Sequence, residues 1–252
     1  MAQTDRVLIT CEHGGNRIPA RYRALFAGFE ALLHCHRGYD PGALAMARKL
    51  AGVLDAPLFV STTSRLLIDL NRSIGHPKLY SEATRDAPAA VRREILDRHY
   101  LPYRSVVEAY VAAVIARGSR VIHLSSHSFT PVLDGNVRNA DIGLLYDPAR
   151  AGEAELCRRW QARLKAQAPE LKVRRNYPYT GKSDGFTAFL RRRFPPDAYI
   201  GIELEINQKH VLPGGRRWRA TQDRVVETFH AVTLECQGAE TRAFHEIRSP
   251  LK

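Results

Sequence analysis

The chain has 252 residues, of which 44% are hydrophobic and 25% are charged. This balance is ordinary for a globular protein of one or two domains and excludes wholesale disorder. No apolar run approaches the roughly 18 residues that a membrane-spanning helix needs, and the N-terminal segment has no secretory signal pattern. We therefore expect a soluble protein located in the cytoplasm.

The formal net charge of +12 makes a basic nucleic-acid-binding protein the alternative from outside the enzymes. Only seven of the 38 basic residues are Lys, and the Arg residues are spread along the chain, most densely at 191–193 and 216–219. No helix-turn-helix, RNA-recognition or zinc-finger pattern accompanies them. We therefore do not expect nucleic acid to be the partner.

The four cysteines, Cys11, Cys35, Cys157 and Cys236, lie far apart in the sequence and form no CxxC pair. A chain of this length folds without disulfides, so the cysteines are expected to be free thiols in a reducing compartment. A zinc site built from thiolates is not expected.

Short apolar runs alternate with helical patterns along the chain. The runs predict strands at residues 6–11, 57–61, 66–70, 120–125, 142–146, 172–174 and 199–206. Helical spacing predicts helices at residues 41–54, 87–117 with a break or kink at Pro102, 153–165, 184–193 and 218–236.

Strands that alternate with helices indicate an α/β protein with a largely parallel or mixed sheet that is covered by helices on both faces. No internal repeat, low-complexity tract or Gly/Ser linker interrupts the pattern. Residues 1–252 are therefore expected to form a single domain, with a loosely held tail after about residue 238.

Polar side chains with catalytic or ligand chemistry lie near the ends of four predicted strands. In open α/β sheets, ligands bind beyond the carboxyl ends of the strands. Several such ends that meet at one edge of a sheet therefore predict a functional site. The candidate residues are His13 after the first strand, Arg65, Asn71 and Arg72 around the third, His127 after the fourth, and Glu203 and Glu205 in the last.

These residue types suit hydrolysis of an amide at a mononuclear zinc site. Two His and one carboxylate are usual ligands of catalytic zinc, and they leave a position open for water. A second carboxylate would act as general base, one Arg would stabilise charge on the carbonyl oxygen, and another would bind a carboxylate of an anionic substrate.

Other catalytic motifs are missing from the sequence, which has no HExxH, GxSxG, GxGxxG or phosphate-binding loop. A hydrolase pair of His127 with Ser126 or Ser128 is disfavoured, because adjacent residues in a strand point to opposite faces.

Six segments occur in the order typical of one enzyme family. They are CEHGGNRIP at 11–19, HRGYDPGA at 36–43, SRLLIDLNR at 64–72, SHSFTP at 126–131, NYPYTGKSDG at 176–185 and ELEINQ at 203–208. This series resembles the motifs of the N-formylglutamate amidohydrolase family. That family is similar in fold and site layout to the zinc carboxypeptidases and to the aspartoacylase/succinylglutamate desuccinylase group. The resemblance implies a phosphorylase/hydrolase-like, three-layer α/β/α sandwich around a mixed sheet.

The resemblance also implies a zinc ion as cofactor, with His13 and His127 as its first and last ligands. The second ligand is less certain, because the carboxypeptidase relatives use His-x-x-Glu and the residue three after His13 is Asn16. Asp40 is the first choice and Glu12 the second. Asp40 also precedes Pro41 at a predicted helix start. Its alternative role is therefore that of a helix N-cap without metal binding.

The remaining roles follow from the same resemblance. Glu205 matches the general base, while Glu203, on the same face of the strand, is the alternative. Arg65 matches the residue that polarises the scissile carbonyl, and Asn71 and Arg72 match the pair that binds a substrate carboxylate.

Several nearby residues have simpler interpretations. Asp69 is expected to pair with Arg65 or Arg72, and His36 and His123 are expected to be supporting residues rather than ligands. The loop with Tyr177, Tyr179 and Lys182 either closes over substrate or is an ordinary exposed loop.

The predicted function is a zinc-dependent amidohydrolase that cleaves a small anionic N-acyl amino acid, similar to N-formylglutamate, into a short acid and an amino acid. Such an activity belongs to amino-acid catabolism, with histidine degradation as the pathway that the resemblance suggests. The alternatives among enzymes are a deacylase for another N-acyl amino acid and a small metallopeptidase. No membrane partner is expected, and the sequence leaves the oligomeric state open.

Overall fold

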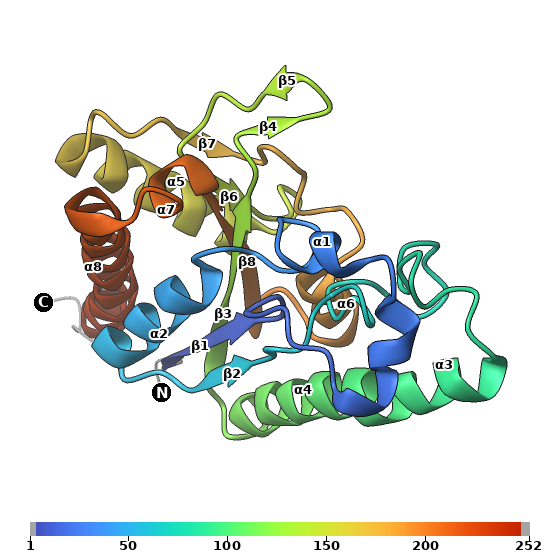
Figure 1. Ribbon diagram of the computed structural model, residues 1–252. Helices are drawn as coiled ribbons and strands as arrows, with labels where there is room; N and C mark the ends of the chain where they lie inside the picture. The colour runs from blue at the N-terminus through green and yellow to red at the C-terminus, as the bar shows by residue number, and fades with distance from the viewer. Residues whose placement is uncertain (1–3, 248–252) are drawn as a thin grey trace, which may run out of the picture.

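The computed structural model describes residues 4–247, with side chains described as far as residue 234. Six strands form one mixed sheet in the order β2-β1-β3-β8-β6-β7 (Figure 1). The sheet runs parallel from β2 through β1 and β3 to β8, whereas β6 is antiparallel to β8 and parallel to β7. The strands are β1 (Asp5–Cys11), β2 (Leu58–Val60), β3 (Arg120–Phe129), β6 (Ile142–Leu145), β7 (Val173–Arg175) and β8 (Tyr199–Asn207).

Helices cover both faces of this sheet (Figure 1). One face packs against α2 (Ala43–Leu54), α5 (Ala151–Gln167) and α8 (Gly215–Ile247), and the other against α4 (Leu101–Ala116) and α6 (Phe186–Arg193). The predicted three-layer α/β/α sandwich around a mixed, largely parallel sheet is therefore confirmed. The shorter elements are η1 (Ala20–Phe26), α1 (Glu30–Leu33), α3 (Ala89–Ile95), η2 (Leu96–Tyr100), α7 (Gln208–Val211) and the hairpin of β4 (Val132–Leu133) and β5 (Asn136–Val137).

The strand pattern explains the two cores. In β1, Ile9 belongs to the core under α2, α5 and α8, whereas Leu8 belongs to the core under α4 and α6. Successive side chains of a strand point to opposite faces, so a central strand that is apolar at every position stabilises both layers. Within the larger core, Trp160 of α5 packs on Phe229 of α8 with ring centroids 4.6 Å apart.

The predicted strand at residues 66–70 is wrong, because this segment forms a series of turns outside the sheet. Its apolar side chains are buried in a separate small core with Tyr22, Phe26 and Tyr100. The Asp69 carboxylate accepts a hydrogen bond from the backbone N–H of Asn71, and Ser64 Oγ accepts one from Leu66. Such side-chain bonds to the local backbone favour turns over sheet pairing, which an apolar run alone does not reveal.

Two predicted helices differ from the structure in detail. The 87–117 helix is divided by the π-helical segment η2, which ends just before the predicted break at Pro102. Pro102 has no N–H for the carbonyl of residue 98, so the regular ladder is interrupted there. The last helix extends beyond 218–236 in both directions and continues to Ile247. The side chains after residue 234 lie outside the described part of the structure, so the loosely held tail after residue 238 stays a prediction.

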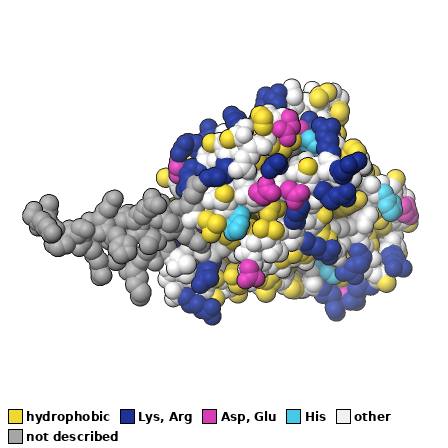
Figure 2. Space-filling model, turned by 90° about the vertical axis from the view of Figure 1, so that its left-hand side faces the viewer, with side chains coloured by type: hydrophobic (Ala, Val, Ile, Leu, Met, Phe, Trp, Pro, Cys, Tyr) yellow, Lys and Arg dark blue, Asp and Glu magenta, His cyan; other side chains and the backbone are white. Residues whose placement is uncertain are grey.

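The surface in Figure 2 shows Lys and Arg in several separate groups, interspersed with acidic and hydrophobic side chains. Within residues 4–247, none of the helices is both long enough and apolar enough to cross a membrane.

Candidate active site

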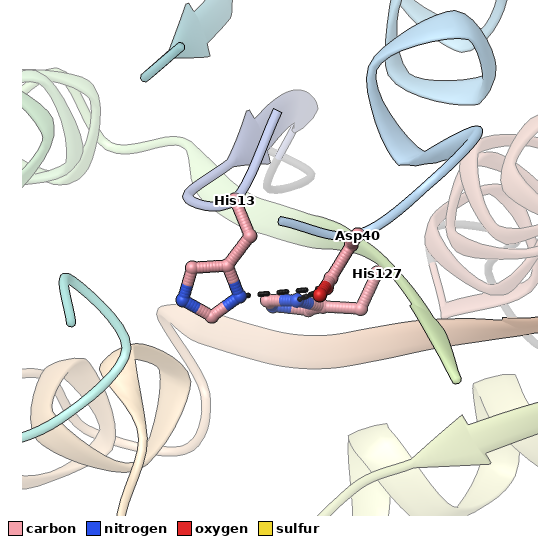
Figure 3. Close-up of side chains that lie close together, drawn as sticks. All are labelled: His13, Asp40 and His127. Atoms are coloured by element: carbon pink, nitrogen blue, oxygen red, sulfur yellow. Dashed lines mark hydrogen bonds and ion pairs between the residues drawn. The ribbon is translucent and has the colours of Figure 1, made fainter. Parts of the chain in front are cut away.

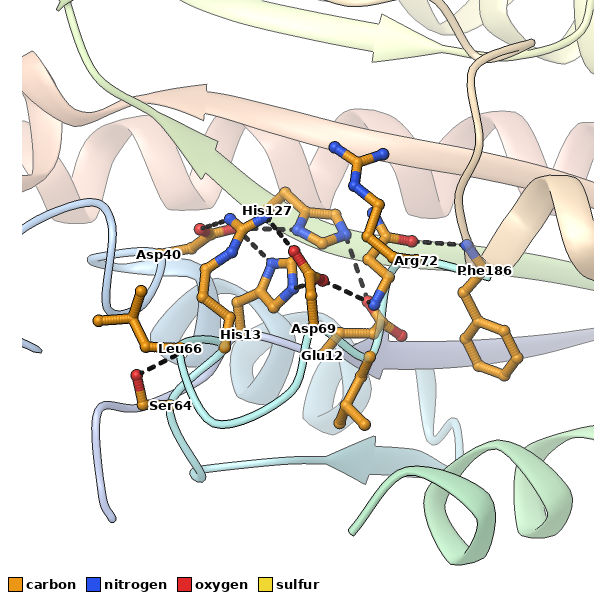
Figure 4. A network of polar contacts seen from close by, with 12 residues as sticks. Glu12, His13, Asp40, Ser64, Leu66, Asp69, Arg72, His127 and Phe186 are labelled. Carbon is orange, nitrogen blue, oxygen red and sulfur yellow. Dashed lines mark hydrogen bonds and ion pairs between the residues drawn. The ribbon is translucent and has the colours of Figure 1, made fainter. Parts of the chain in front are cut away.

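The carboxyl ends of β1 and β3 meet the segment before α2 and the turns at residues 64–72, which brings His13, His127, Asp40 and Arg72 close together (Figure 4). In the register of β3 and β8, His127 lies opposite Glu205, and Ser125 lies opposite Glu203. Because side chains alternate along a strand, these four residues point to the same face of the sheet. His13 is in the turn that follows β1, and Asp40 lies just before α2.

His13, Asp40 and His127 form a buried cluster in which one ligand-type atom of each lies within 4.8 Å of the others (Figure 3). Asp40 Oδ2 is 2.8 Å from His127 Nδ1 and 3.4 Å from His13 Nδ1. Both imidazoles therefore direct the same nitrogen toward one carboxylate oxygen. Two His and one Asp are a ligand set typical of catalytic zinc.

The opposite ring nitrogens of the two histidines are held by carboxylates (Figure 4). His13 Nε2 lies 2.8 Å from Asp69 Oδ1, and His127 Nε2 lies 3.2 Å from Glu12 Oε2. Metal-ligating histidines usually bind a carboxylate or carbonyl in this way, because that contact fixes the ring orientation and leaves the other nitrogen free for the metal. Glu12 therefore lies behind His127, whereas Asp40 faces the shared centre.

The charges of the cluster favour a cation. Burial by itself would raise the pKa of Asp40, but His13, His127 and Arg65 hold it well below its usual range. The same balance of burial against cationic and hydrogen-bonding partners lowers the pKa of Glu12 and of Asp69. For His127, burial is outweighed by hydrogen bonds to Asp40 and Glu12, which raise its pKa. Two imidazole nitrogens and one carboxylate oxygen thus converge on one buried point, so the residues present fit a divalent cation.

Glu205 lies beside this cluster with an unusual environment. It is buried, and its Oε2 has no hydrogen-bond partner among the residues that the structure describes. Burial raises its pKa to about 8; the charge of His127 opposes this shift, and the charges of Asp40 and Glu203 add to it. A carboxylate with a pKa near neutral pH can accept and return a proton efficiently. Glu203 is occupied instead, because Thr187 donates a hydrogen bond of 2.7 Å to its Oε1.

Arg65 connects Asp40 of the cluster with Asp69, which lies beside the cluster. Its guanidinium donates to Asp40 Oδ1 at 3.2 Å and to Asp69 Oδ2 at 2.8 Å, and its side chain remains 25% exposed. Of the two expected partners of Asp69, Arg65 is therefore the one that forms the ion pair. Arg65 can hold negative charge at the cavity wall while it orients Asp40 at the centre and Asp69 behind His13.

Asn71 and Arg72 lie on the turn that follows Asp69. The Asn71 Oδ1 accepts a 2.6 Å hydrogen bond from the first N–H of α6, at Phe186. Arg72 Nη1 donates at 2.5 Å to the backbone carbonyl of Asp184, while its buried Nε has no partner among the described side chains and backbone. The turn is therefore held against the start of α6, and both Asn71 and Arg72 line the cavity described below.

All seven predicted site residues line one cavity of about 520 Å³. Its volume suits a small molecule. A larger and shallower hollow of about 940 Å³ lies along β7 and α5 and contains none of these residues. The cavity is also lined by Arg138 and Tyr179. The sequence analysis gave Arg138 no role, and it left open whether the loop with Tyr179 closes over substrate or is an ordinary exposed loop.

Sequence reasoning missed the supporting roles of Glu12 and Ser125. Ser125 Oγ donates to Glu12 Oε2 at 2.6 Å and lies 2.9 Å from His127 Nε2. The available signal was the spacing of Ser125 and His127, which places both on one strand face. The position of Glu12 depends on how β1 packs beside β3, which the sequence pattern does not show.

His123 lies deeper on the same face of β3, between Thr10 and Tyr199. Its Nε2 is 2.8 Å from Thr10 Oγ1, and its Nδ1 is 2.7 Å from the Tyr199 hydroxyl. Burial lowers the pKa of His123 to about 4. The folded protein therefore keeps this imidazole neutral.

We expect this buried imidazole to make the metal-free protein less stable in acid. Between pH 6.5 and about 4 the unfolded chain takes up a proton that folded His123 does not, so the free energy of unfolding falls by about 3 kcal/mol from this residue. Urea unfolding at pH 7 and pH 4.5 in chelator, for the wild type and His123→Asn, measures the effect. The variant should lose less stability between the two pH values, and an equal loss would contradict the assignment.

The fold is that of an α/β protein with a polar cavity at one edge of its sheet, and comparisons with known proteins identify its class. The chain belongs to the N-formylglutamate amidohydrolase family, whose model matches residues 5–212. The gene product Atu2144 of Agrobacterium tumefaciens is similar in structure, with a TM-score of 0.78 and 30% identity over 92% of this chain and 91% of that one.

A second solved structure supports the same fold. It is the N-formylglutamate amidohydrolase from Ralstonia eutropha JMP134, with a TM-score of 0.69 and 18% identity over 94% of this chain and 96% of that one. No curated protein matches the sequence.

Proposed function

We propose that this protein is a zinc-dependent amidohydrolase that cleaves a small N-acyl amino acid, similar to N-formylglutamate, into a short acid and the free amino acid. The observation that carries the proposal is the buried, unpartnered Glu205 beside the cluster of His13, Asp40 and His127, in a cavity of about 520 Å³. Membership of the N-formylglutamate amidohydrolase family supports the choice of an amide substrate.

The proposed zinc ligands are His13, Asp40 and His127. When bound there, zinc would lower the pKa of a water molecule and polarise the acyl carbonyl of the substrate. Glu12 and Asp69 hold the outer nitrogens of the two histidines, and thereby keep both rings turned toward the centre.

Glu205 is the proposed general base. It accepts one proton from the attacking water, and it then donates that proton to the nitrogen of the leaving amine as the C–N bond breaks. Its Oε2 is suited to both steps, since it is buried beside the proposed ligands and has no hydrogen-bond partner among the described residues.

Arg65 and the Asn71–Arg72 turn are proposed to orient the substrate. Arg65 stabilises the negative charge that develops on the acyl oxygen. The Asn71 amide and the Arg72 guanidinium bind the carboxylate next to the scissile amide, which positions the carbonyl toward Glu205.

The proposal is tested by release of formate and free amine from N-formylglutamate. We expect turnover that is lost after treatment with a zinc chelator and restored by about one equivalent of zinc per chain. Turnover that survives complete removal of metal would contradict the zinc assignment. A zinc-loaded protein that releases no amine from N-formylglutamate, while it hydrolyses another N-acyl amino acid, would move the proposal to that substrate.

A further inference from the structure

A separate cavity of about 510 Å³ lies between α4 and α6 (Figure 1). Its lining residues come from η2 and α4, from α6, and from the turn at Ser73 and Ile74. The predicted site residues all line the other cavity, so this one is distinct from the candidate active site. Its charged lining residues are three Arg and one Glu, namely Arg104, Glu108, Arg192 and Arg193.

Arg104 is a buried cation without an acidic counterion. Its side chain is buried, and no acid in the described part of the chain forms an ion pair with it. Nη1 donates to the backbone carbonyls of Leu70 and Arg72 at 3.0 and 3.2 Å, but Nη2 has no hydrogen-bond partner among the described residues. A buried unpaired charge and a buried unpaired donor are both costly. An anion bound beside Arg104 would remove both costs.

Aromatic rings hold the Arg104 guanidinium in place. Its central carbon lies 4.4 Å from the ring centroid of Phe189, 4.5 Å from that of Phe186 and 5.0 Å from that of Tyr100. Stacked rings restrain a planar guanidinium but do not take up its N–H donors, which lie in its plane. The guanidinium is therefore oriented before any ligand binds, which lowers the entropy cost of binding.

Arg192 and Arg193 bring two further positive charges to the cavity, and both side chains are exposed. Arg193 Nε lies 3.5 Å from Glu108 Oε1, and Arg192 Nη2 donates a hydrogen bond of 3.5 Å to Ser73 Oγ. Three Arg and one Glu give the lining a net formal charge of +2. A phosphate monoester carries about −1.5 to −2 charges at pH 7, so its charge matches that of the lining.

The cavity also has apolar walls. Ile74 and Leu101 line it with exposed aliphatic side chains, and Phe189 adds an aromatic one. An inorganic phosphate ion would leave these side chains uncovered, whereas a cavity of this volume suits a small organic molecule. The lining therefore fits a phosphate group attached to an apolar or planar body.

We propose that the cavity between α4 and α6 is a second ligand site, which binds a phosphate monoester with an apolar or planar body. Arg104 and Arg192 bind the phosphate oxygens, because the guanidinium fork matches their geometry. The body of the ligand contacts Ile74 and Leu101. Since Arg104 also binds the carbonyl of Arg72, the ligand lies beside the turn that lines the active-site cavity.

The test is calorimetric titration of the full chain with phenyl phosphate, phenyl sulfate and inorganic phosphate. Phenyl sulfate has nearly the same shape as phenyl phosphate but carries only one negative charge. We expect it to bind at least about fivefold more weakly, because one charge interaction is lost. Inorganic phosphate should also bind more weakly than phenyl phosphate, since it does not contact the apolar walls.

Two variants change this cavity while they leave the buried Arg104 in place. Arg192→Gln removes a charge-assisted contact and should weaken binding of phenyl phosphate about tenfold. Ser105→Glu adds a negative charge at an exposed lining position and should weaken it at least as much. Arg138→Gln is the matched control, because it removes an Arg from the other cavity, and it should leave the affinity within about twofold. Circular dichroism and Tm check the fold of each variant.

Three results would overturn the proposal. The first is the absence of phenyl phosphate binding by the wild type at millimolar concentration. The second is an unchanged affinity in both Arg192→Gln and Ser105→Glu, or an equal loss in Arg138→Gln, which would place the ligand elsewhere. The third is equal affinity for phenyl phosphate and either of the other two anions, which would contradict the assignment of a phosphate monoester with an apolar body. None of these measurements depends on amide hydrolysis, so the proposal stands or falls separately from the proposed function.

Discussion

Glu205→Gln is expected to lower kcat by about 10²–10⁴-fold, the range that general acid–base catalysis contributes. Gln has nearly the same shape as Glu but cannot accept the proton of the attacking water. Because the proposed metal ligands are unchanged, zinc content should equal that of the wild type. The measurement is the steady-state rate of amine release, with metal content determined on the same samples.

Glu203→Gln is the matched control for this prediction. Glu203 lies two residues earlier on the same face of β8, but its carboxylate accepts a hydrogen bond from Thr187. Its substitution should reduce kcat far less than that of Glu205. If the order of the two effects were reversed, Glu203 would be the base and the role given to Glu205 would be wrong.

His127→Ala is expected to abolish both metal binding and turnover. The substitution removes the central member of the proposed ligand set, since His127 contacts Asp40 through one ring nitrogen and Glu12 through the other. It also leaves two buried carboxylates without their shared partner, so we expect the protein to unfold at a lower temperature. Metal content by mass spectrometry should fall from about one zinc per chain to near zero.

Thermal unfolding gives a readout that does not depend on activity. If zinc binds as proposed, zinc at 100 times its Kd should stabilise the wild type by about 2.7 kcal/mol, a rise in Tm of roughly 5–10 °C for a chain of this size. We expect no such rise in His127→Ala. His36→Ala is the control, because His36 lines the same cavity without belonging to the cluster, and it should keep the zinc-dependent rise.

A third variant separates direct ligands from the residues that hold them. Glu12→Gln keeps the three proposed ligands but weakens the carboxylate contact behind His127, which should reduce zinc affinity about 10- to 100-fold without abolishing binding. A complete loss of zinc in Glu12→Gln, together with full retention in Asp40→Asn, would make Glu12 the ligand and contradict the assignment of Asp40.

The sequence alone determined the layered α/β architecture and the positions of its principal strands. Residues 6–11, 120–125 and 199–206 are apolar runs that end in polar residues, and each lies in an observed strand. A buried parallel strand has few other sequence patterns available to it, because both of its faces pack against helices. The same reasoning selected His13, His127 and the pair Glu203 and Glu205 as candidates, since polar residues at the ends of such strands meet at one edge. The family resemblance then favoured Glu205 over Glu203.

The family resemblance put Asp40 ahead of Glu12 as the second ligand, but only the tertiary structure shows where each acid lies around the two histidines. Asp40 and Glu12 both carry a carboxylate that could act as the second zinc ligand. The spacing of residues in the sequence does not rank one above the other. Only the packing of the turn before α2 against the end of β3 brings Asp40 to the Nδ1 side of both rings, while the pairing of β1 with β3 places Glu12 behind His127.

The 66–70 segment shows the same limit. Its apolar residues indicated burial correctly but not the conformation, because local side-chain bonds from Ser64 and Asp69 turn the chain away from the sheet. That turn is also what directs Asn71 and Arg72 into the cavity. Apolar periodicity reports how deeply a segment is buried, whereas the direction of its side chains depends on contacts between segments far apart in the sequence.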